Sequence, residues 1–282
     1  MSWLVFALVF WIGAWALNTF LANSVLRTSL VVRVLIPVLF GMTLIVLWEG
    51  VVRGLGVSPV ILPPPSTVAQ TFAASTDILW EDFQQTVLKG ALSGFVIGVL
   101  AAFGTAIVID RSGFLTRGLL PIGNFVAALP IVGIAPILVS WFGFDWHSKA
   151  AVGGVRVVFP ILGNTVQGLR ETDSMQRDLM RTYAASYLDT LLKLRLPAAL
   201  PFVFNGLKIA TTLALIGAIV AEYFGSPTRG MGFRISTGVG SLSIDLVWAE
   251  IAVSAMAGTA FYGFVAWFEK RVTFWHPSHR GH

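Results

Sequence analysis

The sequence predicts an all-α protein built as a polytopic bundle of membrane-spanning helices. The 282 residues are 56% hydrophobic and only 12% charged, with a mean hydropathy of +0.79. A soluble core of this length could not bury so much apolar surface. The apolar residues also fall into runs of about 20, the length of helix that crosses the hydrocarbon core of a bilayer. We therefore expect membrane lipid to surround most of the chain.

Seven of these runs are predicted to be membrane spans. They lie near residues 3–21, 31–52, 87–109, 119–142, 149–168, 203–224 and 247–268. No basic segment precedes the first run and no small-residue cleavage site follows it, which favours an uncleaved helix over a signal peptide. The predicted domains are therefore an additional N-terminal transmembrane helix, residues 1–30, and a second domain, residues 31–282.

Two local patterns refine this picture. The uncharged, proline-rich stretch GVSPVILPPPSTVAQTF predicts a rigid extended connector, followed by a short helix capped by Ser66 or Thr67. In the third run, Gly90, Gly94 and Gly98 recur every four residues. Glycines at this spacing predict one helix face that another helix can approach closely.

The polar segment over residues 170–200 predicts an exposed helical hairpin. Asp173, followed three residues later by Gln176, is typical of a capping box. Apolar side chains then recur at intervals of four, which predicts a stripe along one side of a helix. The stripe consists of Met175, Leu179, Tyr183 and Tyr187. Pro197 should push Leu196 out of the helical region and so end the second arm. From this pattern alone, the hairpin either docks a partner protein or lies against the membrane interface.

The stretch DLMRTYAASYLDTLLKLRLPAALPFVFNGLKIA resembles the cytoplasmic coupling segment, or EAA loop, of ABC importer permeases. That pattern has an acidic residue, two alanines, a glycine and a Leu-Pro pair. Asp178 takes the acidic place, and Leu196 with Pro197 forms the closing pair. Three positions depart from the pattern, because Leu179 and Met180 replace the two alanines and Ala184 replaces the glycine. Because Ala184 cannot adopt a left-handed backbone cheaply, we expect the turn here to be more helical than usual.

Further stretches are similar, in order and spacing, to the sulfonate, nitrate and taurine branch of these permeases. They are ILPPPSTVAQTF, ALPIVGIAPILVSWFGF, VFPILGNTVQGLRETD, AEYFGSPTRGMGF and FEKRVTFWHP. The resemblance covers roughly residues 33 to 277 and leaves the first helix outside. It implies a type I ABC importer permease core within residues 31–282, with its cytoplasmic coupling segment at about 170–200.

The resemblance also implies that the hairpin docks a separate ABC ATPase subunit. The implied coupling residues are Met175, Asp178, Leu179, Arg181, Tyr183, Ala184, Ser186, Tyr187, Leu196 and Pro197. The sequence has no G-x-x-x-x-G-K-[ST] motif, so we expect that this chain is not an enzyme. We expect ATP and Mg²⁺ to bind to the partner ATPase, and this chain to have no cofactor of its own. The other implied partners are an external substrate-binding protein and a second permease subunit, which is either a second copy of this chain in a homodimer or a related chain.

Polar residues within the predicted spans are candidates for a translocation path. They are Asn124, Arg156, Asn164, Gln167, Asn205, Thr211 and Glu222. Arg156 is the deepest charge, so it either pairs with backbone carbonyls or a carboxylate, or attracts an anionic substrate. The uncharged residues would serve equally well as hydrogen bonds between helices. We expect most of the charges near the spans to lie close enough to a span end to be solvated; the main ones are Glu49, Arg156, Glu222, Asp245, Glu250 and Glu269.

The distribution of basic residues predicts the orientation. If residues 169–202 face the cytoplasm, more than twice as many Lys and Arg residues lie at cytoplasmic span ends as at outer ones. This places the amino terminus outside and the carboxyl terminus inside, in a bacterial inner membrane. The basic residues are too scattered for a nucleic-acid-binding patch. His276, His279 and His282 are predicted to form a solvated tail, although their spacing would also suit a metal.

The resemblance therefore implies the permease subunit of an ATP-driven importer for a small polar or anionic organic solute, of the sulfonate, nitrate or taurine class. The alternative is a secondary transporter driven by an ion gradient, which should carry midplane acids or broken helices in paired repeats. A membrane-embedded enzyme would need titratable groups that converge at one depth, and the sequence has few.

Overall fold

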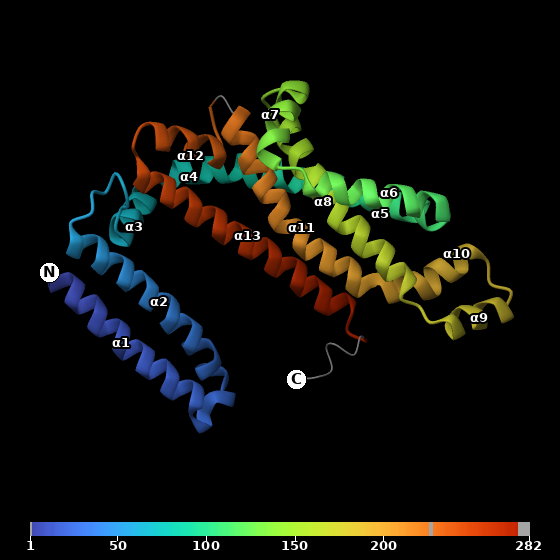
Figure 1. Cartoon of the computed structure of the whole chain (residues 1–282), viewed down its shortest axis with the longest axis horizontal. Helices are drawn as coiled ribbons and strands as arrows, with labels where there is room; N and C mark the ends of the chain where they lie inside the picture. Colours follow the sequence, from blue (N-terminus) through green and yellow to red (C-terminus); the bar gives the residue numbers. More distant parts are fainter. Residues whose placement is uncertain (1, 226–227, 276–282) are drawn as a thin grey trace. The chain divides into compact units, whose positions relative to one another are not determined.

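A computed structural model describes residues 2–225 and 228–275, apart from the side chains at positions 26, 120 and 124. Every regular element within these ranges is helical, as the composition predicts (Figure 1). The chain divides into two compact units. The first comprises residues 1–79 and 237–250, and the second comprises residues 80–236 and 251–282.

The elements follow one another along the chain with short connections. Those that lie within the first unit are α1 (Ser2–Asn23), the 3₁₀ turn η1 (Val25–Thr28), α2 (Leu30–Leu55) and α3 (Pro65–Ala74). Those that lie within the second are the π-helix η2 (Gln84–Ala91), α5 (Leu92–Asp110), α6 (Gly113–Ala128), α7 (Ile131–Phe142), α8 (Trp146–Arg170), α9 (Ser174–Thr182), α10 (Tyr187–Thr190), the π-helix η3 (Leu191–Arg195) and α11 (Leu196–Gly225). Both units receive residues from α4 (Thr76–Phe83), α12 (Met231–Gly240) and α13 (Ile244–Val272).

The predicted spans agree largely with these helices. Within the described residues, five helical runs are long and apolar enough to cross a membrane. They are Ser2–Asn23, Leu30–Leu55, Thr76–Asp110, Tyr187–Gly225 and Ile244–Val272. Helix α8 covers the predicted span at 149–168 but is not among these five, because it is less apolar than they are. It buries much of its length against its neighbours.

The predicted span over residues 119–142 is not one straight helix, because this stretch forms two helices that are apolar enough to cross a membrane only together. Helices α6 and α7 meet at an angle of 98°. The break falls at Leu129, whose φ of −64° and ψ of 136° are extended. Pro130 follows Leu129 directly, and a proline disfavours the helical conformation of the residue before it.

In the first unit, α1 packs closely against α2 through small residues. Ala7 is fully buried and lies directly over Gly50. Leu4 contacts Gly54 one turn further along, where a Cβ on the glycine would lie 2.8 Å from the Cβ of Leu4. The N-terminal helix is therefore fitted to α2 by the absence of side chains at two positions.

The connector after α2 ends in a helix, but its predicted cap is wrong. Helix α3 begins at Pro65 with Pro64 as its N-cap residue, so neither Ser66 nor Thr67 caps it. The Ser66 backbone N–H and hydroxyl instead donate to the carboxylate of Glu49, at 2.9 and 2.7 Å. The acidic side chain thus lies at the positive N-terminal end of α3, where the helix dipole favours it.

In the second unit, the core forms where α8 packs between α5 and α11 (Figure 1). The glycine face of α5 lies against α8, as predicted. A Cβ at Gly94 would lie 2.9 Å from the backbone oxygen of Ala150, and one at Gly98 would lie 2.7 Å from Cγ1 of Val157. Side chains at these positions would force the helices apart, so the spacing of the glycines sets the packing distance.

Candidate functional site

The outgoing arm of the hairpin, helix α9, is largely exposed. The predicted capping box is confirmed, and the Gln176 Oε1 accepts a hydrogen bond from the Asp173 backbone N–H at 3.2 Å. No residue of α9 is buried. Met175, Leu179 and Tyr183 are 76%, 56% and 76% exposed. The arm therefore presents a largely exposed apolar stripe.

The turn at the tip of the hairpin is left-handed, which contradicts the predicted helical turn. Ala184 has a φ of 50°. The Ala185 N–H donates to the Met180 carbonyl at 3.0 Å, and the Ala184 N–H donates to the Arg181 carbonyl at 2.9 Å. These two bonds are those of a Schellman motif, in which a left-handed residue satisfies the last carbonyls of a helix. The hydrogen bonds thus override the local preference of alanine.

The return arm, residues 187–195, begins at a second cap. Ser186 precedes α10, and its hydroxyl oxygen accepts a hydrogen bond from the Asp189 N–H at 3.1 Å. Tyr187 starts this arm and is half-buried. The prediction that Tyr187 shares a face with Met175 and Tyr183 is therefore wrong, because the left-handed turn ends α9 before the pattern reaches it.

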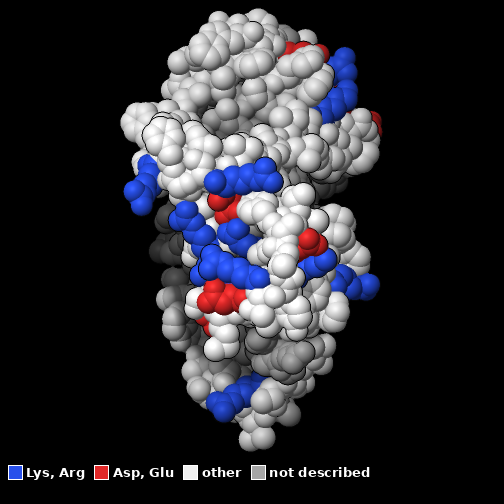
Figure 2. Space-filling view, turned by 90° about the vertical axis from the view of Figure 1, so that its right-hand side faces the viewer, with Lys and Arg blue, Asp and Glu red and all other residues white. Residues whose placement is uncertain are grey.

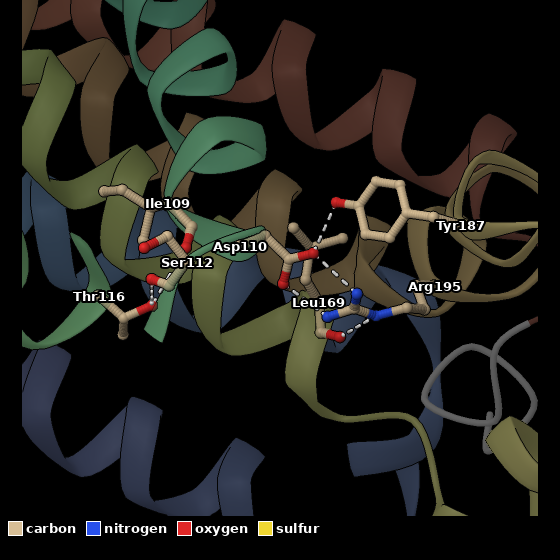
Figure 3. Close-up of polar contacts among 7 residues, drawn as sticks. All are labelled: Ile109, Asp110, Ser112, Thr116, Leu169, Tyr187 and Arg195. Carbon is tan, nitrogen blue, oxygen red and sulfur yellow. Dashed lines mark hydrogen bonds and ion pairs between the residues drawn. The ribbon is translucent and has the colours of Figure 1, made fainter. Parts of the chain in front are cut away.

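Asp110 holds the return arm at both of its ends (Figure 3). The Arg195 guanidinium donates to the two oxygens of this carboxylate at 2.7 and 2.6 Å. Its Nε donates to the Leu169 carbonyl at 2.9 Å. The Tyr187 hydroxyl donates to the Asp110 Oδ2 at 2.8 Å, and the Arg111 guanidinium lies 4.6 Å from the centroid of the tyrosine ring. We call these five residues the Asp110 cluster.

The helix continues past the Leu-Pro pair, so the predicted stop at Leu196 is wrong. Leu196 is helical, with φ −64° and ψ −48°, and its N–H donates to the Leu191 carbonyl five residues earlier. This wider π turn lies directly before Pro197, which has no N–H to donate. The return arm and α11 therefore form one continuous helical run from Tyr187 to Gly225.

The end of the molecule that carries α9 and α10 is shown face-on in Figure 2. Basic side chains gather in the middle of this face, with acidic side chains between them. The hairpin itself carries two exposed ion pairs: Arg181 with Asp178 at 3.2 Å, and Lys193 with Asp189 at 2.6 Å. The hairpin therefore presents both signs of charge beside its apolar stripe.

Of the predicted path residues, the structure brings two together. The Asn205 Nδ2 donates to the Asn164 Oδ1 at 3.0 Å, which links α11 to α8. Thr211 is buried and its hydroxyl donates to the Lys208 carbonyl of its own helix at 2.7 Å. Gln167 is exposed, and the side chain of Asn124 lies outside the described residues.

Arg156 pairs with backbone carbonyls at the break between α6 and α7. Its Nη1 donates to the Ala127 oxygen at 3.0 Å and lies 3.5 Å from the Leu129 oxygen. Carbonyls at the end of a helix lack partners within it. Arg156 supplies that partner, which matches the first of the two roles that the sequence leaves open.

Glu222 is buried, so the expectation of solvation is wrong for this residue. It is 1% exposed. Its Oε2 accepts from the Thr86 hydroxyl at 2.6 Å and from the Gly232 N–H at 3.1 Å. The Thr86 oxygen in turn accepts from the Met231 N–H at 2.8 Å. The start of α12 is thus capped by side chains from η2 and α11.

A second carboxylate completes this network. The Asp82 Oδ1 accepts from the Gly230 N–H at 2.6 Å, and its Oδ2 accepts from the Arg234 Nε at 2.8 Å. Lys149 is 1% exposed, and its Nζ donates to the Phe144 carbonyl. The sequence shows Asp82 and Arg234 only as charges near span ends, because their pairing depends on the folded arrangement.

Comparison with known proteins identifies the family. The model of the binding-protein-dependent transport system inner membrane component matches residues 94–274. A Haemophilus influenzae protein described as an ABC transporter permease is 35% identical over 240 residues, which cover 84% of this chain and 96% of that one. A Bacillus subtilis protein described as an aliphatic sulfonates transport permease is 30% identical over 250 residues, which cover 84% and 86%.

A relative with a different named solute lies in the same range. The formylaminopyrimidine transport permease protein of Halalkalibacterium halodurans is 29% identical over 231 residues, which cover 82% of this chain and 90% of that one. The matched segment contains the hairpin, the Asp110 cluster and the start of α12. The chain belongs to the family of binding-protein-dependent transport system inner membrane components and is an ABC transporter permease.

Proposed function

We propose that this chain is the permease subunit of an ATP-driven importer and that a separate ATPase docks on its hairpin. The observation that carries this proposal is the stripe of Met175, Leu179 and Tyr183, exposed on an arm with no buried residue. Apolar side chains at helical spacing are the usual anchors when a helix enters a groove on a partner protein. That the implied coupling residues of the hairpin contact the ATPase remains a prediction, which measurements of ATPase binding would test.

The sequence supports the proposal that ATP is bound and hydrolysed by a different subunit. The chain lacks the phosphate-binding motif of nucleotide hydrolases. ATP and Mg²⁺ therefore bind in the partner ATPase in this proposal. Closure of that partner moves the hairpin, and the continuous helical run from Tyr187 to Gly225 carries the movement toward the interior of the bundle.

The proposed solute is a small polar or anionic organic molecule of the sulfonate, nitrate or taurine class. Relatives are named for aliphatic sulfonates and for taurine, which supports this class. Others are named for formylaminopyrimidine, riboflavin and bicarbonate, so the fold serves several solutes. In this proposal a substrate-binding protein delivers the solute, and a homodimer of the permease encloses a path lined by Asn164, Gln167 and Asn205.

The proposed orientation has the hairpin in the cytoplasm, the amino terminus outside and the carboxyl terminus inside. The basic side chains gathered on the hairpin face support it, since cytoplasmic segments carry an excess of Lys and Arg (Figure 2). The exposed charged pairs of the hairpin support its placement outside the lipid, because they would be costly within it, but they do not favour one side of the membrane.

Reconstitution tests the proposal. The tagged chain is purified from its native membrane with any subunits that bind it, and the complex is placed in sealed vesicles with its binding protein. Uptake that requires ATP and persists when ion gradients are collapsed is the expected result. Uptake that follows a proton or sodium gradient and ignores ATP would favour the secondary transporter. A nucleotide-binding subunit should co-purify with the chain.

A further inference from the structure

The two arms of the hairpin are attached to the rest of the second unit in different ways. No residue of α9 is buried. The return arm instead buries Leu191, which is 3% exposed and packs with Leu169 and Ala199. The return arm is therefore part of the bundle, while α9 projects from it.

The link between Asp110 and Arg195 has the geometry of a rigid joint. A guanidinium that donates through two nitrogens to two carboxylate oxygens is fixed in both direction and rotation. The arginine side chain is 16% exposed and the aspartate side chain is 4% exposed, so water hardly competes for these bonds. A single lysine ammonium would keep the charge but could not keep this orientation.

The joint lies where three helical runs meet. Asp110 is the last residue of α5, the Leu169 carbonyl belongs to the last turn of α8, and Arg195 directly precedes α11. Helix C-terminal ends carry partial negative charge, so a cation here is favoured and an unpaired carboxylate is disfavoured. Arg195 therefore binds a backbone carbonyl at the end of α8 and a side-chain carboxylate at the end of α5, as Figure 3 shows.

We propose that Asp110 and Arg195 are positioning residues for coupling, which hold the return arm rigidly to α5 and α8 so that a push on α9 moves these helices and α11 together. The inference rests on the proposed function of the hairpin. Tyr187 adds a second point of attachment, at the other end of the return arm. Two attachments to one carboxylate prevent the arm from swinging about either end.

A double substitution separates this role from a merely structural one. Replacing a buried ion pair with apolar residues of similar size often leaves stability unchanged, whereas removing one partner leaves a buried charge. The variant Asp110→Leu with Arg195→Met should therefore fold and bind the ATPase. We expect it to hydrolyse ATP but to move about three- to thirtyfold fewer solute molecules per ATP, the range that coupling residues typically affect.

Two further variants sharpen the result. Arg195→Lys keeps the positive charge but loses the paired hydrogen bonds to the two Asp110 oxygens. It should therefore show a smaller fall in transport per ATP than the double variant, without loss of assembly. Lys193→Gln removes a cation two residues away whose partner, Asp189, is exposed, so it should match the unmodified chain. Unchanged transport per ATP in both the double variant and Arg195→Lys would overturn the inference.

A distance measurement tests the joint without reference to ATP. The chain has no cysteine, so spin labels can be placed at Val108→Cys in α5 and Leu192→Cys in the return arm, both exposed. The label-to-label distance should be narrowly distributed in the otherwise unmodified protein and in Lys193→Gln, and broad in the double variant. If the double variant and the otherwise unmodified protein gave distance distributions of equal width, the rigid joint would be refuted. This result does not depend on whether ATP-driven uptake is observed, so it can be distinguished from a failure of the proposed function.

Discussion

The Lys208 ammonium lies 2.8 Å from a carboxylate oxygen of Glu269, and this ion pair joins α11 to α13 within the second unit. The two side chains are only 20% and 12% exposed. Both residues lie in helical runs that are apolar enough to cross a membrane. A charge in such a position needs a partner of opposite charge, and here Lys208 and Glu269 are each other's partner.

Removing one member of this pair should destabilise the protein more than removing both. Glu269→Gln leaves the ammonium without its counter-charge, and the loss of one partner in a buried pair costs about 3–5 kcal/mol. The double variant Lys208→Met with Glu269→Met should recover most of that stability. Thermal unfolding in one detergent measures the difference.

The control for this comparison is an exposed pair. Glu81 pairs with Arg229 at 2.8 Å, but both side chains are at least half exposed. Glu81→Gln should therefore cost about 0–1 kcal/mol. If Glu269→Gln were no worse than Glu81→Gln, the pair between α11 and α13 would not be a buried one.

Glycine at position 184 should stabilise the hairpin. Ala184 has a φ of 50°, and a left-handed backbone costs an alanine about 1–2 kcal/mol. Glycine avoids this strain but loses more backbone entropy on folding, so we expect a net gain of about 0.5–1 kcal/mol. Slower proteolysis of the hairpin in Ala184→Gly would show the gain. Ala185→Gly is the matched control and should give faster proteolysis, because Ala185 has no left-handed backbone to relieve.

A bulky residue at the same position should separate assembly from transport. Ala184→Trp keeps the stripe on α9 but worsens the left-handed strain at the tip. We expect a complex that still forms and still hydrolyses ATP but transports poorly. Measured in the same lipid, normal transport together with normal assembly would argue against a role for the turn in coupling.

Tyr183→Ala should weaken the docking of the ATPase. Tyr183 is 76% exposed on the described chain, and a large aromatic anchor at an interface typically contributes about 2 kcal/mol or more. The affinity should therefore fall about thirtyfold. Thr182→Ala, an exposed neighbour, is the control. Equal affinity in the two variants would mean that the stripe rests on the membrane interface instead.

The proposed topology can be tested by labelling, because the chain has no cysteine of its own. A single cysteine at Ser186 should react with an impermeant thiol reagent only from the cytoplasmic side. A cysteine at Ser241 should react only from the outside. Both positions are accessible to solvent, so burial does not limit the reaction. Labelling of both from one side would overturn the proposed orientation.

Local patterns in the sequence predicted much of the fold. Hydropathy located most of the long helices, and the capping box located the start of α9. These features depend on residues close together in the chain. The break at Leu129 was equally local, since Pro130 follows it, but the continuous apolar run concealed it.

Contacts between distant residues could not be predicted in the same way. Asp110 and Arg195 are 85 positions apart, and nothing in either local pattern indicates the other. The burial of Glu222 likewise depends on Thr86, which is 136 positions earlier. The conformation of Ala184 also differs from its intrinsic preference, because hydrogen bonds of the finished turn outweigh that preference.

The capping of α12 has a consequence for the order in which the protein is made. The Gly230 and Met231 N–H groups bind Asp82 and Thr86, which are 148 and 145 positions earlier. During synthesis these two side chains leave the ribosome long before the groups that satisfy them. Asp82 is completely buried in the finished protein, so it has to stay hydrated or bind a provisional donor until residue 230 arrives. Closing so long a loop is slow, and the docking of α12 is therefore a late step of assembly.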